Sequence, residues 1–561
     1  MKKLVALLAA LLSSILIVTA CSTSTPAPAA ATTTQPSAAK PAAPSSAATS
    51  PSTTNPVATT VAATKPAVTT PATTTPANKY GGILRTIEPV SATTPIGIPW
   101  ETSGNSVLFM QLALQAPVKE QIDGAITPNL AASFDVVTDP ANPSITFHFQ
   151  KGVKFSDGTD FNAQAVKWNY DQIIASNMYP NVTSYWKSLE VLDDYTLKIN
   201  MTTWLNKALA SFGNSLFVIS PTAFQKSGLE TLRWQMVGTG PFMQAGFQRD
   251  VSLTTVKNPN YWEQGKPYVD KIQILSVADE MTRLALFKSG GADVLNTNGS
   301  GRIAQDFQNA GYKIITQPAG TTILIPDSLN ADSPWSNQKV RYAADYALDR
   351  ESIAKAFGYG YWNPVYQLSN PTSLAYDKNL PGRKYDVAMA KQLLTEAGYP
   401  NGFKTTLIAQ NNADTNMVAA IQSYLGKVGI QCEIQMAAAG LFTTYSNMGA
   451  LWKNAIILNT QTAWANPTTG INGSFGIPST GWQSTAKPPG WKDTLTAAMT
   501  STKLEPALLQ KVEDMAYDYA MVIPLYAGSS MWVANPNVQD SGIGTRASQN
   551  WWEPQNVWLS K

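Results

Sequence analysis

Regular alternation of apolar and polar residues predicts half-buried strands in the first half of the chain. Residues 145–150 alternate strictly, with Ile145, Phe147 and Phe149 on one face and polar side chains on the other. A period of two residues is typical of a strand with one buried face. Further strands are expected at residues 195–201, 251–256 and 272–277.

Apolar residues spaced three and four apart predict helices, mainly in the second half. The run that begins at Val340 follows the i, i+3, i+4, i+7, i+8 spacing of an amphipathic helix. Residues 386–397 are expected to form a helix closed by Gly398, and Pro506 to begin another that ends before a strand at 522–526. Because helices and strands interleave in both halves, the pattern favours an α/β fold.

The first 20 residues have the pattern of a secretion signal. Lys2 and Lys3 precede an apolar run at 4–18, and small residues then lead to Cys21. This arrangement is typical of a bacterial lipoprotein signal peptide, which is cleaved before a cysteine that receives lipid. We therefore expect lipidation at Cys21 and anchoring to the outer face of the cytoplasmic membrane, in the periplasm if a second membrane exists. An ordinary signal peptide or a retained anchor helix remains the alternative.

The segment that follows, residues 21–79, consists almost wholly of Ala, Thr, Ser and Pro. Such a composition offers too little apolar surface to offset the entropy cost of ordering the chain. We interpret it as a disordered tether between the membrane and a folded body. Residues 80–561 exceed one typical hydrophobic core, so two or three domains are expected there.

Charge and aromatic content narrow the classes of partner. The formal net charge is only +3 over 561 residues, and no block of like charge occurs. Nucleic acid is therefore an unexpected partner. Charged residues make up 14%, whereas there are 16 Trp and 21 Tyr. These rings belong either to a large aromatic core or to a cavity suited to sugars or peptides.

The residues that catalysis or metal binding would need are scarce. His148 is the only histidine and belongs to the alternating run at 145–150, while Cys432 lies in a strand-like run at 430–434. We interpret Cys432 as a small buried hydrophobe rather than a nucleophile. Neither nickel, which favours His or Cys ligands, nor any cofactor is expected. A carboxylate pair acting as a surface glycoside or peptide hydrolase stays open.

A series of short blocks follows a fixed order along the chain, at residues 81–85, 128–131, 146–158, 238–242, 258–262, 340–351, 396–403 and 523–526. Together these blocks resemble family 5 extracellular solute-binding proteins, the peptide- and nickel-binding group that feeds ABC importers. Most of them are interpreted as scaffold. Arg341 and Asp349, for example, fall where they can satisfy unpaired backbone groups at helix ends.

The resemblance implies an α/β clam shell of two lobes, with an extra subdomain in lobe I. Lobe I would comprise residues 80–110, 240–324 and 528–561, with the subdomain at 111–239, and lobe II would comprise 325–527. The protein would be a monomer that encloses a peptide and delivers it to an ABC permease and its ATPase. An oligosaccharide or other neutral solute is the alternative ligand.

Two departures from the family pattern bear on the ligand. The lobe II acid that pairs with a peptide amino group in the family corresponds here to Ala463, and the next acidic position holds Asn466. The family's lobe I segment "Tyr-Glu-Gly" corresponds here to Leu114-Gln115-Ala116. Both departures remove negative charge, and a buried ammonium without a carboxylate is costly. A neutral, hydroxyl-rich ligand fits these changes, although peptides held through their backbone remain possible.

Side chains that stack on a ligand or read its hydroxyl and amide groups cluster at two places. Trp rings pack against C–H faces, and Asn and Gln offer both donors and acceptors. For each Trp, packing in the core or at its rim is the alternative interpretation. The candidate ligand-binding residues are Trp464, Asn466, Asn459, Gln461, Trp362, Tyr361 and Asn363.

Overall fold

The computed structural model describes residues 78–447, 452–477, 481–545 and 552–560. The chain divides into two units, Met1–Thr74 and Thr75–Lys561, and every described residue belongs to the second. The signal peptide, nearly all of the tether and the lipidation site Cys21 lie outside the described residues and stay predictions. The lobe boundaries expected from the sequence also stay a prediction.

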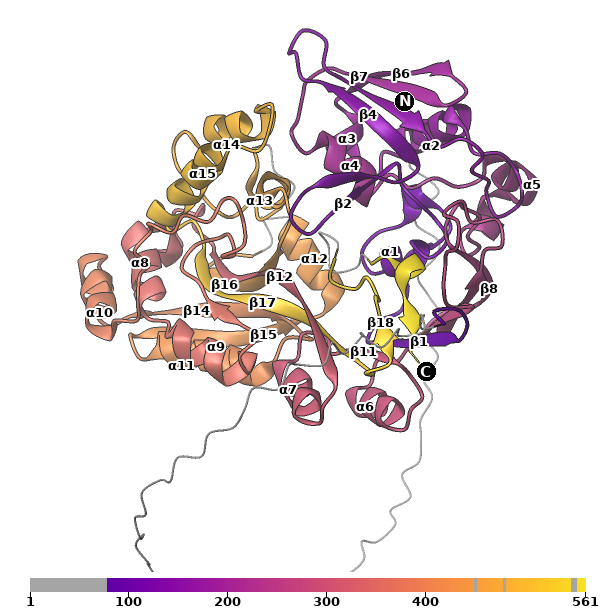
Figure 1. Ribbon diagram of the computed structural model, residues 1–561. Coiled ribbons are helices and arrows are strands. Elements are labelled where there is room, and N and C mark those ends of the chain that lie inside the picture. Colours follow the sequence, from indigo (N-terminus) through magenta and orange to yellow (C-terminus); the bar gives the residue numbers. More distant parts are fainter. Residues whose placement is uncertain (1–77, 448–451, 478–480, 546–551, 561) are drawn as a thin grey trace, which may run out of the picture. The chain divides into compact units, whose positions relative to one another are not determined.

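Eleven strands join into one mixed sheet in the described part of the chain. Ten follow the order β15-β14-β16-β12-β17-β11-β1-β10-β9-β8, and β13 pairs with β17 (Figure 1). The strands are β1 Ile83–Glu88, β8 Phe242–Gln248, β9 Ser252–Lys257, β10 Lys271–Ser276, β11 Val294–Asn296, β12 Lys313–Pro326, β13 Asn363–Pro364, β14 Phe403–Gln410, β15 Ile430–Ala437, β16 Ala455–Thr462 and β17 Ile523–Ala534. Strands β9, β10 and β17 confirm three strands predicted from the sequence.

The two longest strands, β12 and β17, hold this sheet together. They pair in antiparallel register from Lys313 opposite Ala534 to Leu324 opposite Ile523. The far edge of β12 pairs with β16, and the other edge of β17 pairs with β11. One register shift in the β12–β17 ladder falls next to Pro318, which has no amide hydrogen to donate.

Helices cover both faces of the sheet around β12, β14 and β16, so the buried segments 323–326, 407–409 and 455–458 are continuous apolar runs rather than alternating ones. Leu324 of β12 packs with residues of α8 to α11, whereas its neighbours Ile323 and Ile325 pack with α14 and α15 on the opposite face. These helices are α8 Gln338–Tyr346, α9 Arg350–Gly358, α10 Val387–Glu396, α11 Thr415–Gly426, α12 Ala439–Asn447, α13 Pro467–Phe475, α14 Trp491–Thr500 and α15 Pro506–Asp518. Both α10 and α15 confirm predicted helices.

A second, four-stranded antiparallel sheet of order β4-β5-β7-β6 packs with the helix α2. Its strands are β4 Ala131–Val137, β5 Ser144–Phe149, β6 Trp186–Asp193 and β7 Thr196–Met201. Ile145 and Phe147 of β5 are fully buried, as the alternation predicts. The helix α2, Ala163–Ser176, begins where Asn162 Oδ1 accepts a hydrogen bond from the Ala165 amide at 2.8 Å.

The remaining elements are short. The strands are β2 Val118–Glu120, β3 Ile126–Pro128, β18 Val538–Gln539 and β19 Trp558–Leu559. The α-helices are α1 Ser106–Met110, α3 Pro180–Thr183, α4 Ala208–Asn214, α5 Pro221–Leu232, α6 Glu280–Lys288 and α7 Gly301–Asn309. The 3-10 helices are η1 Pro99–Glu101, η2 Pro334–Ser336 and η4 Pro554–Asn556. Together with the two sheets, they confirm the predicted α/β class.

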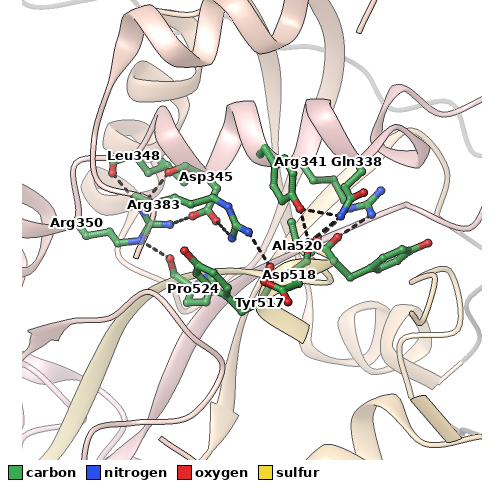
Figure 2. A network of polar contacts seen from close by, with 12 residues as sticks. Gln338, Arg341, Asp345, Leu348, Arg350, Arg383, Tyr517, Asp518, Ala520 and Pro524 are labelled. Atoms are coloured by element: carbon green, nitrogen blue, oxygen red, sulfur yellow. Dashed lines mark hydrogen bonds and ion pairs between the residues drawn. The ribbon is translucent and has the colours of Figure 1, made fainter. Parts of the chain in front are cut away.

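Buried arginines attach α8 and α9 to the chain that enters β17 (Figure 2). Arg341, which is fully buried, donates to the carbonyl oxygens of Tyr519 at 2.8 Å and Ala520 at 3.0 Å, just after α15. Asp349 caps α9 by accepting from the Ser352 amide at 3.0 Å. The scaffold roles predicted for Arg341 and Asp349 are therefore confirmed.

The carboxylate of Asp345 links two buried arginines, Arg350 and Arg383. Asp345 pairs with Arg350 through one oxygen and with Arg383 through the other, at 3.1 Å from Arg383 Nη1. Arg350 also donates from Nε to the Pro524 carbonyl oxygen at 2.7 Å, inside β17. All these groups are buried, so each charge depends on its partner.

Replacing Arg350 tests this dependence. We expect Arg350→Leu to lower the free energy of unfolding by about 3–5 kcal/mol, because Asp345 loses half of its charge pairing inside the core. The matched control is Lys339→Met, which breaks the exposed Lys339–Glu396 pair of 2.9 Å and should cost less than about 1 kcal/mol. Urea unfolding of both variants measures the difference. Equal small losses would contradict a structural role for the buried network.

Candidate functional site

Two cavities adjoin at the polar end of β16. The larger cavity has a volume of about 860 Å³ and the smaller cavity about 430 Å³. Asn459 and Thr460 line both of them, so the cavities meet along this strand. Their volumes fall within the usual range of small-molecule binding sites.

The smaller cavity lies between β16, the helix α13 and residues around α4. Four candidates from the sequence line it together, namely Trp464, Asn466, Asn459 and Gln461. Other lining residues include Glu120, Tyr179, Lys207 and Asn214. The Trp464 ring lies so close to Gly470 of α13 that a Cβ atom on Gly470 would come within 2.8 Å of the ring. Only glycine therefore leaves room for the ring at this place.

Asn466 and Gln461 already hold protein partners. As the cap of α13, Asn466 Oδ1 accepts from the Thr468 amide at 3.1 Å and from its hydroxyl at 2.7 Å, and Asn466 Nδ2 donates to Asn206 Oδ1 at 2.9 Å. Gln461 Oε1 accepts from Ser474 Oγ at 2.8 Å. These contacts orient both side chains at the cavity wall.

The larger cavity has an aromatic wall. Trp362 stacks on Tyr526 of β17 with ring centroids 4.0 Å apart and planes 1° apart, and both residues line the cavity. The neighbouring candidates Tyr361 and Asn363 line neither cavity. Tyr361 donates its hydroxyl to Gln308 Oε1 at 3.0 Å, and Asn363 is exposed.

Charged groups at the larger cavity are already engaged. Arg302 pairs with Glu280 at 2.8 Å and with Asp306 at 3.3 Å. Asp414 caps α11 by accepting from the Asn416 amide at 2.8 Å. The uncharged lining includes Thr297, Asn298, Ser300, Thr322, Asn412, Asn416, Asn459, Thr460 and Ser529. Such a lining offers many hydrogen-bonding groups to a polar ligand.

Lys207 is one of the lining residues that sequence reasoning missed. Only 4% of it is exposed, although it lines the smaller cavity. The signal that could have found it is a lysine that directly precedes the apolar run Ala208–Ala210. Residue spacing alone gave no way to place this stretch beside α13.

The structure corrects one argument about the ligand. Gln115, at the position similar to the family's "Tyr-Glu-Gly" segment, lines neither cavity. It is buried and accepts from Trp262 Nε1 at 2.9 Å and from Thr239 Oγ1 at 3.1 Å. The missing acid at this position therefore removes no charge from the cavities. The neutral Asn466, in contrast, does lie at the smaller cavity.

Within the described ranges, no three His, Cys, Asp or Glu side chains gather in a way that could hold a metal ion. No helix in the same ranges combines the length and apolar character needed to cross a bilayer.

Cys432 and His148 belong to different sheets, on β15 and β5. Cys432 is buried, and burial raises its thiol pKa to about 12, so the sulfur stays protonated at neutral pH. His148 Nε2 lies 2.9 Å from Asp135 Oδ2 on the smaller sheet. The interpretation of Cys432 as a buried hydrophobe is confirmed.

We expect Cys432→Ser to leave ligand affinity within about twofold of the original, because the thiol is inert and lines neither cavity. Burying a hydroxyl in its place should cost on the order of 1–2 kcal/mol of stability. Calorimetric titration of the folded variant checks the affinity. Lost binding in a variant that remains folded would show that the thiol has a role in function.

Comparisons with known proteins fit this geometry. The chain is 22% identical to the periplasmic binding protein DppA of Helicobacter pylori, solved with the peptide STSA, with a TM-score of 0.74 over 86% of this chain and 99% of that one. It is also 22% identical to NikA of Brucella suis, solved with Fe(III)-EDTA, with a TM-score of 0.75 over 85% of this chain and all of that one. The fold is therefore that of the bilobal periplasmic binding proteins, as predicted.

Sequence comparison gives the family. The model for bacterial extracellular solute-binding proteins, family 5 (middle), matches residues 125–480. The glutathione-binding protein GsiB of Salmonella choleraesuis (strain SC-B67) is 33% identical over 326 residues, or 55% of this chain and 61% of GsiB. The match thus spans about three fifths of that relative. The chain belongs to family 5 of the bacterial extracellular solute-binding proteins.

Proposed function

We propose that this protein is the substrate-binding lipoprotein of an ABC importer and captures short peptides outside the cytoplasm. The observation that supports the proposal most is the pair of polar cavities that share Asn459 and Thr460. Family membership supports a role in binding rather than catalysis. Ligand delivery to a permease, with ATP hydrolysed by a partner ATPase, completes the proposed cycle, in which the receptor acts as a monomer anchored through Cys21.

Peptides suit the two cavities because extended chains are recognised through main-chain hydrogen bonds, with pockets for alternate side chains. The amide and hydroxyl groups around Asn459 provide both donors and acceptors for a peptide backbone. Trp464 and Trp362 provide apolar surfaces, one in each cavity. A relative named for glutathione binding and a neighbour solved with a peptide agree with this class of ligand.

An oligosaccharide is the second candidate, and the placement of Trp464 favours it. The ring lies in a cavity with Asn459, Gln461 and Asn466, a combination that suits stacking and hydroxyl recognition of a sugar. The two candidates differ in charge, because a peptide has ionised termini and a neutral sugar has none.

Thermal unfolding of the purified protein with matched panels of short peptides and neutral oligosaccharides tests the proposal. A ligand at 100 times its dissociation constant should stabilise the protein by about 2.7 kcal/mol, which raises the unfolding midpoint measurably. A shift with peptides supports the proposal, and a shift with sugars alone would replace it with the second candidate. Chemical turnover of a bound compound would contradict both.

Trp464→Ala should weaken ligand binding by on the order of tenfold, because a cavity aromatic residue contributes contact surface that alanine lacks. Stability should fall by less than about 1 kcal/mol, since the ring is partly exposed. The control is Trp234→Ala, which removes a similarly exposed ring, stacked on Phe247, that lines neither cavity. Calorimetric titration of both variants decides. An unchanged dissociation constant for Trp464→Ala would place the ligand elsewhere.

A further inference from the structure

Lys207 occupies an unusual position at the start of α4. The residue is only 4% exposed, yet it lines the smaller cavity together with residues of β16 and α13. The preceding residue, Asn206, fixes the backbone there, because Asn206 Nδ2 donates to the Ala498 carbonyl oxygen at 2.6 Å and Asn206 Oδ1 accepts from Asn466 Nδ2 at 2.9 Å. Lys207 is thus held at a junction of α4, α13 and α14.

The Lys207 ammonium has no hydrogen-bond acceptor and no ion-pair partner among the described residues. Other lysines with limited exposure do have partners. Lys119 Nζ lies 3.2 Å from Glu553, and Lys266 Nζ lies 2.9 Å from Glu263. Lys487 Nζ donates to two carbonyl oxygens, the nearer at 2.7 Å on Thr485. Lys207 therefore differs from lysines in the same fold that serve structure.

The electrostatics at Lys207 agree with the geometry. Burial lowers its pKa, and no neighbouring acid acts to raise it. Glu120 lines the same cavity and accepts a hydrogen bond from Asn214 Nδ2, and no ion pair joins it to Lys207. Holding an ammonium in a largely buried position without a counter-charge is costly. That cost is recovered when a ligand brings an anion into the cavity.

We propose that Lys207 Nζ binds a carboxylate of the ligand, so that the captured solute is a short peptide with a free carboxylate. The inference rests on the proposed function and specifies the charge of its ligand. Both the C-terminal carboxylate and an acidic side chain could supply the anion.

Affinity for matched probes tests the assignment. The tetrapeptide Ser-Thr-Ser-Ala is titrated with a free C-terminal carboxylate and as its C-terminal amide. Glutathione, which has two carboxylates, is the third probe.

We expect the free acid to bind about tenfold or more tightly than the amide, because hydrogen bonds between charged groups are stronger than those between neutral groups. In Lys207→Met the preference should fall within twofold, and in Lys207→Arg it should persist. Glutathione binding that also depends on Lys207, without a preference between the tetrapeptides, would assign the anion to a carboxylate other than the C-terminal one.

The control is Lys226→Met, which removes an exposed lysine of α5 and should keep the full preference. If the tetrapeptide acid and its amide bind with equal affinity, and Lys207→Met leaves the affinity for glutathione unchanged, the Lys207 assignment is wrong. The proposed function would still stand. Binding of none of these probes, together with a response to oligosaccharides, would overturn both.

Ligand-free protein provides a second measurement. Lys207→Met removes a buried charge that has no partner and keeps a similar volume, so the unfolding midpoint of the ligand-free variant should rise. A lower midpoint would show that Lys207 serves structure, and the assignment would then be wrong.

Discussion

The pairing of β12 with β17 is the constraint on which the rest of the structure depends. These two strands connect β11 and β1 on one side to β16 and β14 on the other. The stacked Trp362–Tyr526 pair rests on β17, and the cavity residues Asn459 and Thr460 lie on the strand that pairs with β12. Arg341 holds the chain just before β17, and Arg350 holds it at Pro524, the second residue of that strand. Any loss of this ladder would separate the walls of both cavities.

The position of the cavities follows from a change of polarity within single strands. On β16, Ala455 to Leu458 are buried, whereas Asn459 to Thr462 are more exposed. The antiparallel partner β12 runs the opposite way, so its polar segment Gly320–Thr322 faces the polar end of β16. The apolar ends of β12 and β16 are therefore buried together in the core, and their polar ends lie together at the cavities. Gly320 permits this approach, because a Cβ atom there would clash with the Gln461 carbonyl oxygen.

Much of the scaffold could be predicted because it depends on local signals. Alternating runs predicted β5 and β7, and the arginine at 341 belongs to a short motif with a physical role. Trp464 was identified with its neighbours for the same reason, since these residues share one short segment.

The rest of the site depends on contacts between distant segments. Consecutive residues of an extended chain point to opposite faces, so Trp362 can line a cavity only when Tyr361 and Asn363 turn away. Asn206 meets Asn466 across 260 residues of sequence, and this contact gives the neighbouring Lys207 its place at the cavity. Residue spacing also does not reveal the hydrogen-bond partners of a side chain, and for Gln115 these partners decide whether it belongs to the scaffold or to the site.

The most direct test of the account is a crystal structure of the protein with a bound peptide acid. The account predicts electron density that spans both cavities along Asn459 and Thr460, with one ligand carboxylate within hydrogen-bond distance of Lys207 Nζ. A peptide that lies outside these cavities would contradict the site. A peptide inside them whose carboxylates all point away from Lys207 would keep the site and contradict its charge assignment.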